Sequence, residues 1–329
     1  MRNGKVLSPL DTAIASFVAH QRTFGRSYIY AEYALRALGQ FAADRAADLS
    51  ASLFEQWSKA QRKLSPTTLY GRQLLARKMC LHRRRSEPGC FVPDPSDFAR
   101  PRPHAAPVIV TRAQIAAVLR AADQLAPSRH NPLRAATMRI AIVLLYTAGL
   151  RRGELVRLQL GDVDAENGAL HIRESKFHKS RWIPLSSDAR RELREYLRKR
   201  MRKPFGLRPT APLLCNASRA YGHVGWHAFC GPGLAQGLLS LFDGAGVHDT
   251  QGRRPRVQDM RHSFAVEALV RWYRRGGDVQ THLPKLALYM GHVSIVSTAY
   301  YLHFIPEVAA FASKRFGRHF SHLVKPGAS

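Results

Sequence analysis

The chain has 329 residues, which suits two domains of ordinary size, and a hydrophobic fraction of 45%, which excludes a disordered tail. Lys and Arg number 51 against 23 Asp and Glu, a formal charge of +28, and this excess attracts polyanions, with nucleic acid as the first candidate. An anionic membrane surface is the competing partner, but no apolar run approaches the length of a spanning helix, so we expect no membrane partner.

The cysteines predict neither a disulfide framework nor a zinc site. The four are Cys80, Cys90, Cys215 and Cys230, with no C-x-x-C pair, which indicates a reducing compartment. Two sets come nearest to zinc ligation: Cys80, His82 and Cys90, and His223, His227 and Cys230. Neither matches a complete structural zinc pattern, and buried or incidental thiols are the simpler interpretation. We therefore expect no metal and no cofactor.

The first hundred residues predict a small helical domain. Apolar residues at helical spacing, or cap signals ahead of them, predict helices over residues 10–18, 30–41, 53–57 and 65–79. The apolar face of the second helix includes Tyr30 and Tyr33. Ser65 and Pro66 open the fourth helix as its N-cap and first residue.

A proline-rich segment follows this domain. Residues 87–107 contain six prolines, and proline cannot sustain a helix interior, so we expect an extended segment. Arg100, Arg102 and His104 make its second half basic. Such a linker could run along a DNA backbone or be a solvated spacer, and the sequence favours neither.

The second domain is predicted to mix helices with two short strands. Thr111 and Gln114 form a capping box at its start, and the apolar residues 136–147 predict a buried helix that ends before Gly149. Residues 169–173 and 181–185 are expected to be strands around a basic turn. Helices are expected to resume at residues 187–202 and continue to the C-terminus, with Pro306 starting the last.

Four segments of this domain hold the side chains that cleavage of a phosphodiester requires. They are TAGLRRGELVRL (147–158), ESKFHKSRWIPL (174–185), RVQDMRHSFA (256–265) and MGHVSIVSTAYYLHF (290–304). Cleavage needs a nucleophile, positive charge on the non-bridging oxygens and an acid for the leaving oxygen. A metal route needs clustered carboxylates, and Asp162, Asp164 and Glu166 look like part of a turn instead. The side-chain route needs arginines, a lysine or histidine, and a hydroxyl, and all are present.

In this order, the four segments resemble the signature boxes of the tyrosine recombinase (phage integrase) family. TAGLRRGEL is similar to the first box, with Glu154 as the usual acidic neighbour, and RVQDMRHSFA is similar to H-x-L-R-H-T-F-A. MGHVSIVSTAYYLHF is similar to L-G-H-x-S-x-x-x-T-x-x-Y, and the step from its histidine favours Tyr301 over Tyr300 as nucleophile. The resemblance implies six catalytic residues: Arg151, Lys176, Gln258, Arg261, His292 and Tyr301.

The resemblance also implies a fold and a function. The expected fold is mainly α with a small β-sheet: a helical core-binding (SAM-like) DNA-binding domain over 1–99, a basic Pro-rich linker over 100–110, an α+β catalytic domain over 111–305, and a C-terminal helix and tail over 306–329. Tyr301 would attack a DNA phosphodiester, form a 3′-phosphotyrosyl link and pass the strand to a partner without metal or ATP. The expected partners are double-stranded DNA and, in a homotetramer or hetero-tetramer, related recombinases. The expected location is the bacterial cytoplasm, on the nucleoid.

One position departs from the family pattern. The family usually has histidine three residues before the second arginine, and this chain has Gln258, which can donate a hydrogen bond but cannot take a proton near neutral pH. If that histidine helps to deprotonate the tyrosine, the assistance is missing or comes from elsewhere. His262 is expected to pack or hydrogen-bond structurally. The alternatives are a catalytically impaired DNA-binding relative, a type IB topoisomerase or telomere resolvase, and, more distantly, a metal-dependent nuclease.

Overall fold

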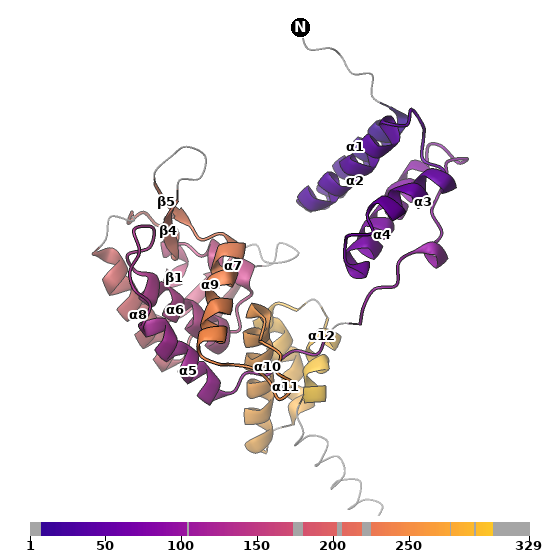
Figure 1. Cartoon of the computed structure of the whole chain (residues 1–329). Coiled ribbons are helices and arrows are strands. Elements are labelled where there is room, and N and C mark those ends of the chain that lie inside the picture. The colour runs from indigo at the N-terminus through magenta and orange to yellow at the C-terminus, as the bar shows by residue number, and fades with distance from the viewer. Residues whose placement is uncertain are drawn as a thin grey trace, which may run out of the picture. The chain divides into compact units, whose positions relative to one another are not determined.

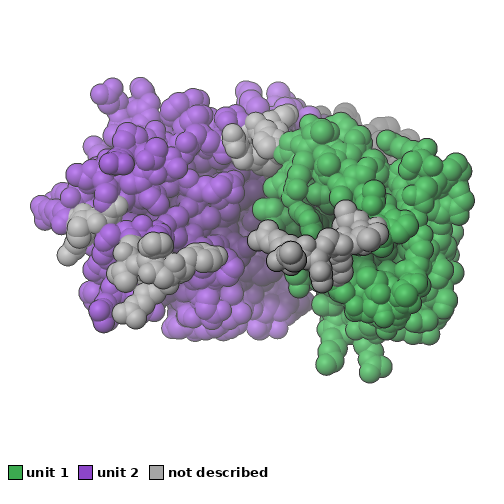
Figure 2. Space-filling model, turned by 90° about the horizontal axis from the view of Figure 1, so that it is seen from above, with its two compact units in different colours: residues 1–105 green, residues 106–329 purple. Residues whose placement is uncertain are grey.

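The structure is a computed structural model that describes residues 8–103, 105–173, 180–202, 206–218, 225–276, 278–292 and 294–304. The chain divides into two compact units, residues 1–105 and 106–329, which Figure 2 shows in green and purple. Both are built mainly from helices, and the second also contains two small antiparallel sheets. This confirms the predicted fold class. Within the described residues, no helix is both long and apolar enough to cross a membrane.

Unit 1 is a set of four helices whose starts follow from local signals. The helices are α1 (Pro9–Thr23), α2 (Ile29–Ala43), α3 (Ala51–Ala60) and α4 (Pro66–Arg83) (Figure 1). The side chains of Ser8, Ser50 and Ser65 accept hydrogen bonds of 3.1 to 3.2 Å from backbone N–H groups three residues on, which caps α1, α3 and α4. The four helices predicted from apolar spacing are thus confirmed.

The apolar face predicted for α2 is wrong at its first turn. Tyr30 and Tyr33 are 59% and 67% exposed, whereas Leu35 and Leu38 are buried in the unit's core. The helix meets its neighbours through a stripe that begins only at Ala34, so both tyrosines face away from the core. Spacing alone cannot show which turn of a helix its neighbours cover.

The proline-rich segment after α4 has two parts. Its first part contains a short 3₁₀ turn, η1 (Pro95–Asp97), and packs on unit 1: Phe98 is 7% exposed in the core, and the N–H of Ala99 donates to Gln73 at 2.8 Å. In the second part, the described residues 100–103 and 105–111 have no regular structure, and α5 begins at Arg112.

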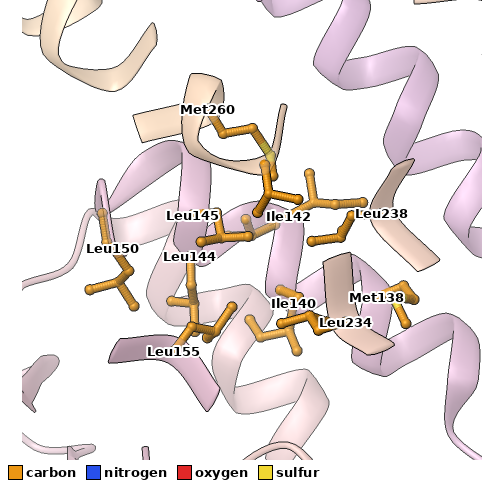
Figure 3. Packing of buried hydrophobic residues seen from close by; sticks show 14 of the residues in the cluster. Met138, Ile140, Ile142, Leu144, Leu145, Leu150, Leu155, Leu234, Leu238 and Met260 are labelled. Carbon is orange, nitrogen blue, oxygen red and sulfur yellow. The ribbon is translucent and has the colours of Figure 1, made fainter. Parts of the chain in front are cut away.

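Unit 2 is centred on one buried helix. Its first helices are α5 (Arg112–Asp123), α6 (Arg134–Thr147), α7 (Arg152–Arg157), α8 (Ser187–Met201) and α9 (Gly231–Gly244). As predicted, Thr111 and Gln114 close a capping box on α5, and α6 is buried over most of its surface. Figure 3 shows Met260 directed at the α6 side chains Ile142 and Leu145. The helix that carries Met260 is therefore anchored in the main core.

Two small sheets border this core. The strands β1 (Val163–Asp164), β2 (Ala169–Ile172) and β3 (Arg181–Pro184) form an antiparallel sheet in that order, with Leu170 opposite Ile183. Strands β2 and β3 were predicted. The expectation of continuous helices after residue 202 is wrong, because β4 (Cys215–Ser218) and β5 (Gly225–Ala228) form an antiparallel hairpin. This segment has no regular apolar alternation, so its pairing is not visible in the sequence.

The C-terminal part of unit 2 has its own apolar cluster. The elements are α10 (Val257–Arg274), α11 (Val279–Met290), α12 (Val296–Ala299) and the 3₁₀ helix η4 (Tyr300–Phe304) (Figure 1). Leu269, Leu286, Met290 and Tyr301 are buried together there. The helix predicted from Pro306 onward lies outside the described residues.

Candidate active site

Arg261, the predicted second arginine, is buried on α10. Asp259 accepts the backbone N–H of Arg256 at 2.9 Å and so closes a capping box that fixes the start of this helix. Arg261 is 1% exposed, and its two terminal nitrogens donate to the carbonyls of Gly149 and Met290, each at 2.5 Å. Burial lowers its pKa to about 10, which still leaves the guanidinium charged at neutral pH.

Arg151, the predicted first arginine, is the N-cap of the short helix α7. Its guanidinium donates to Glu154 at 2.7 Å and to the carbonyl of Gly291 at 2.9 Å. The backbone N–H of Arg151 also donates to Glu154, at 2.9 Å. The acidic neighbour expected from the sequence therefore fixes both the backbone and the side chain of this arginine.

A third arginine, Arg181, completes the group. It lies at the start of β3, and it donates to both carboxylate oxygens of Glu154 at 3.1 and 3.0 Å and to the carbonyl of Tyr289 at 2.8 Å. The only local signal for Arg181 is its position at the end of the predicted basic turn. Its residue type does not distinguish it from the many other arginines.

The three arginines meet at the C-terminal end of α11. The carbonyls of Tyr289, Met290 and Gly291 are successive, and each accepts a hydrogen bond from a different arginine. Gly291 makes this possible because it adopts a left-handed conformation, φ +64°, that ends the helix. The last carbonyls of a helix lack intrahelical partners and carry partial negative charge, so they suit cations.

Glu154 is the anion inside this cluster. Its carboxylate is buried, and burial alone would raise its pKa, but hydrogen bonds from Arg181 and Arg151 outweigh that effect and hold the pKa below its usual value. Arg261 lies 4.0 Å from the same carboxylate. Because one carboxylate serves three guanidinium groups, the cluster keeps a net positive charge, which suits a phosphate.

Tyr301 is the buried hydroxyl beside this cluster. It lies in η4 and is 3% exposed, whereas its neighbour Tyr300 is 42% exposed. Its Oη lies 3.2 Å from Nδ1 of His262. Burial raises the pKa of Tyr301, while Arg261 and Arg151 oppose that rise. The positive cluster therefore acts on this phenol as well.

His292 follows directly after the end of α11. Its Nδ1 lies 2.7 Å from Oγ1 of Thr298, and its ring is stacked near Tyr301, with 6.2 Å between centroids. Burial, and then the charges of Arg261 and Arg151, lower its pKa to about 4. The imidazole is therefore neutral at neutral pH and can donate one hydrogen bond without adding charge.

Gln258 is exposed and lines a hollow with basic walls. It lies one turn before Arg261, and together with Arg151, Arg152 and Arg256 it borders a cavity of about 560 Å³. The surface next to the arginine cluster is thus concave and positive. A phosphate backbone would fit both its charge and its donors.

The contacts described above do not involve Lys176 or a metal site, which the sequence analysis also considered. Lys176 lies in residues 174–179, outside the described residues, although the strands that flank them are present. Among the described residues, no group of three or more His, Cys, Asp or Glu side chains is placed to hold a metal. Of the other five proposed residues, Arg151 and Arg261 donate to the last carbonyls of α11, and His292 and Tyr301 follow this helix with 6.2 Å between their ring centroids. Gln258 lies one turn before Arg261 on α10.

Known proteins resemble this chain over most of its length. A profile of the Phage integrase family matches residues 109–307. Two proteins of Sinorhizobium fredii, both provisionally named integrase/recombinase, are similar: y4rE is 35% identical over 66% of each chain, and y4rB is 31% identical over 95% of this chain and 98% of its own. The solved structure of the Tn1549 transposon integrase in complex with a circular intermediate DNA covers 88% of this chain and 94% of its own, with a TM-score of 0.60 and 18% identity, which shows a shared fold.

Proposed function

Because the chain belongs to the phage integrase family, the tyrosine recombinases, we propose that it cleaves and rejoins DNA strands with the hydroxyl of Tyr301 as nucleophile. The observation that carries this assignment is the convergence of Arg151, Arg261, His292 and Tyr301 around the end of α11. These residues are separated in the sequence and meet only in the fold.

The arginines would bind the scissile phosphate. A guanidinium has five N–H donors, and the hydrogen bonds of Arg151 and Arg261 described above use two of each. Those bonds hold the remaining donors in a fixed orientation. The half-buried Arg151 can then meet a non-bridging oxygen directly, whereas Arg261, which is 1% exposed, would act on the phosphate mainly through its charge. Gln258 and His292 would add neutral hydrogen bonds to the same phosphate.

The reaction would exchange one phosphodiester for another. Tyr301 Oη attacks phosphorus, a 3′-phosphotyrosyl bond forms, and the bond to the 5′ oxygen breaks. Lys176, the match to the family's catalytic lysine, would protonate that oxygen. The covalent link conserves the bond energy, so a 5′ hydroxyl from a partner duplex can reverse the step and join new strands without ATP.

The partners would be DNA duplexes and further recombinase protomers. The chain's charge of +28 suits the first, and strand exchange between two duplexes calls for four cleavages and therefore four protomers, of this chain or of relatives. Unit 1 would serve as the core-binding domain and residues 100–110 as the linker along the DNA. The protein would meet its DNA substrate in the cytoplasm, at the nucleoid.

The first prediction concerns the nucleophile. A DNA substrate nicked near the cleavage site and quenched with denaturant should trap a covalent protein–DNA adduct that still forms in EDTA. Tyr301→Phe should form no adduct and still bind DNA, because it loses one hydroxyl only. Tyr300→Phe is the matched control and should form the adduct at the wild-type rate. An adduct in Tyr301→Phe would exclude the assignment.

A further inference from the structure

His262 contacts the atom that would react. It follows Arg261 on α10, is half-buried, and places Nδ1 3.2 Å from Oη of Tyr301. The two rings are tilted by 56° with centroids 5.5 Å apart, so the imidazole meets the hydroxyl through a nitrogen and not through its face. The sequence predicts only a structural role for this histidine.

We propose that His262 accepts the proton of Tyr301 as Oη attacks the DNA phosphorus. This inference rests on the proposed function and assigns the proton acceptor that the departure at Gln258 leaves open. The amide of Gln258 cannot take a proton, whereas a neutral imidazole at hydrogen-bond distance from the nucleophile can. The base would thus lie one residue after Arg261 and not three residues before it.

The groups around His262 leave it neutral. Burial lowers its pKa below the ordinary value; Asp259 on the same helix opposes this, and Arg256 and Arg261 reinforce it. From other elements, Tyr301 of η4 and His292 face the same space. At neutral pH the ring is therefore uncharged, and in the tautomer with hydrogen on Nε2, Nδ1 offers its lone pair to the phenol.

The proton balance closes in both directions. As the bond from Oη to phosphorus forms, the O–H bond of Tyr301 breaks and its proton passes to Nδ1, while the departing 5′ oxygen takes a proton from Lys176. The imidazolium that results lies beside Arg261, and this like-charge contact favours return of the proton. In the joining step, Lys176 takes the proton of the attacking 5′ hydroxyl, and His262 gives its proton back to Tyr301 as the phosphotyrosyl bond breaks.

The experiment compares cleavage rates of His262→Gln and Lys176→Ala under single turnover. The substrates carry either the natural 5′ oxygen or sulfur in its place at the cleaved bond. A thiolate leaves without a proton, because thiol pKa values are about 8.5. We expect His262→Gln to be slower by about 10²-fold on both substrates, the usual size of base catalysis, and Lys176→Ala to be slow on the oxygen substrate only.

A second test is the pH dependence of the cleavage rate, which can be measured on the wild-type protein itself. Wild-type cleavage should fall as the pH drops through the lowered pKa of His262, because only the neutral ring accepts a proton, and His262→Gln should lack that fall. Gln258→His should speed cleavage in the His262→Gln background, because it restores an imidazole at the family position. His282→Gln, which replaces a half-buried histidine stacked on Trp272, is the matched control and should cleave normally.

Two outcomes separate this inference from the proposed function. If wild type forms the Tyr301 adduct but His262→Gln cleaves as fast, or if wild-type cleavage stays level from about pH 8 down to the pH at which the protein unfolds, His262 is only a packing contact. If wild type forms no adduct that depends on Tyr301, the proposed function itself fails. Thermal unfolding and DNA binding of His262→Gln identify a folding defect, and the wild-type pH profile then decides.

Discussion

The residue that organises the site is Glu154. Arginines so close together repel one another, and Glu154 offsets that repulsion for Arg151 and Arg181 through four side-chain and backbone hydrogen bonds. Arg261 is held mainly by backbone carbonyls. The positive charge of the site is thus positioned by one buried carboxylate and by backbone carbonyls.

Arg181 provides a test of this arrangement. Arg181→Lys keeps the charge, but a single ammonium cannot serve both oxygens of Glu154 and the carbonyl of Tyr289. We expect a loss of about 1 to 3 kcal/mol in the free energy of unfolding, measured with urea, together with slower cleavage. Arg191→Lys is the control, because both partners of its ion pair with Asp188 are exposed and such a pair is worth under about 1 kcal/mol. Equal losses in the two variants would contradict a special role for Arg181.

His292 should make the stability of the folded protein depend on pH in the acidic range. Its pKa is about 4 in the folded chain and near 6.5 when unfolded, so between these values the unfolded state binds more protons. Stability should therefore fall as the pH is lowered from 6.5 towards 4. His292→Gln can keep the hydrogen bond to Thr298 and cannot titrate, so its urea midpoint should fall less over this range. A variant as acid-sensitive as wild type would disprove this contribution.

At the scale of elements, the end of α11 is the part that holds the site together. Its last carbonyls bind three arginines from α7, β3 and α10, and the chain then continues through His292 to Tyr301. A small change in where this helix ends would move the phosphate-binding groups and the nucleophile together. The glycine that ends it is therefore a critical position.

Gly291→Ala tests that position. A Cβ there would lie 2.9 Å from a guanidinium nitrogen of Arg181, and the backbone has φ +64°. Gly276→Ala is the control, since it has φ +75° with nothing within 4 Å of the added carbon. We expect about 1 to 2 kcal/mol of destabilisation from Gly276→Ala, with cleavage unchanged. Gly291→Ala should cost more stability and slow cleavage by about 10²-fold, because the reacting groups shift. Similar cleavage in both variants would count against the role of this helix end.

Most helices and strands could be predicted from the sequence, whereas the contacts that bring the site residues together at the end of α11 could not. Caps such as Ser65 and the Thr111–Gln114 box act within three residues, so a local pattern predicts them. The family motifs indicated Arg151, Arg261 and Tyr301. Arg181 could not be found in this way, because the carbonyl it binds lies 108 residues further along the chain. Nor could the contact of His262 with Tyr301, which depends on how η4 packs against α10.

At the scale of the whole molecule, charge governs how the protein meets DNA. The formal charge of +28 is distributed over both units, so many phosphates can be contacted at once. Each contact releases a counterion, and binding of this kind weakens steeply with salt.

The salt dependence is measurable without cleavage. For Tyr301→Phe, contacts to six to ten phosphates should lower DNA affinity by roughly 10³- to 10⁵-fold between about 50 and 200 mM salt. A duplex of unrelated sequence should show a similar slope, because this part of binding does not read bases. An affinity that hardly changes over this range would mean that the charge is not used for DNA.

The arginine cluster also has a consequence for engineering. A site that gathers positive charge around one carboxylate is less stable than the same fold with more acids nearby, and proteins commonly trade stability for activity at such places. Directed evolution for heat tolerance alone should therefore enrich Asp or Glu around the hollow near Gln258. Such variants would survive heating and fail on their substrate, so a selection for robustness must include turnover from its first round.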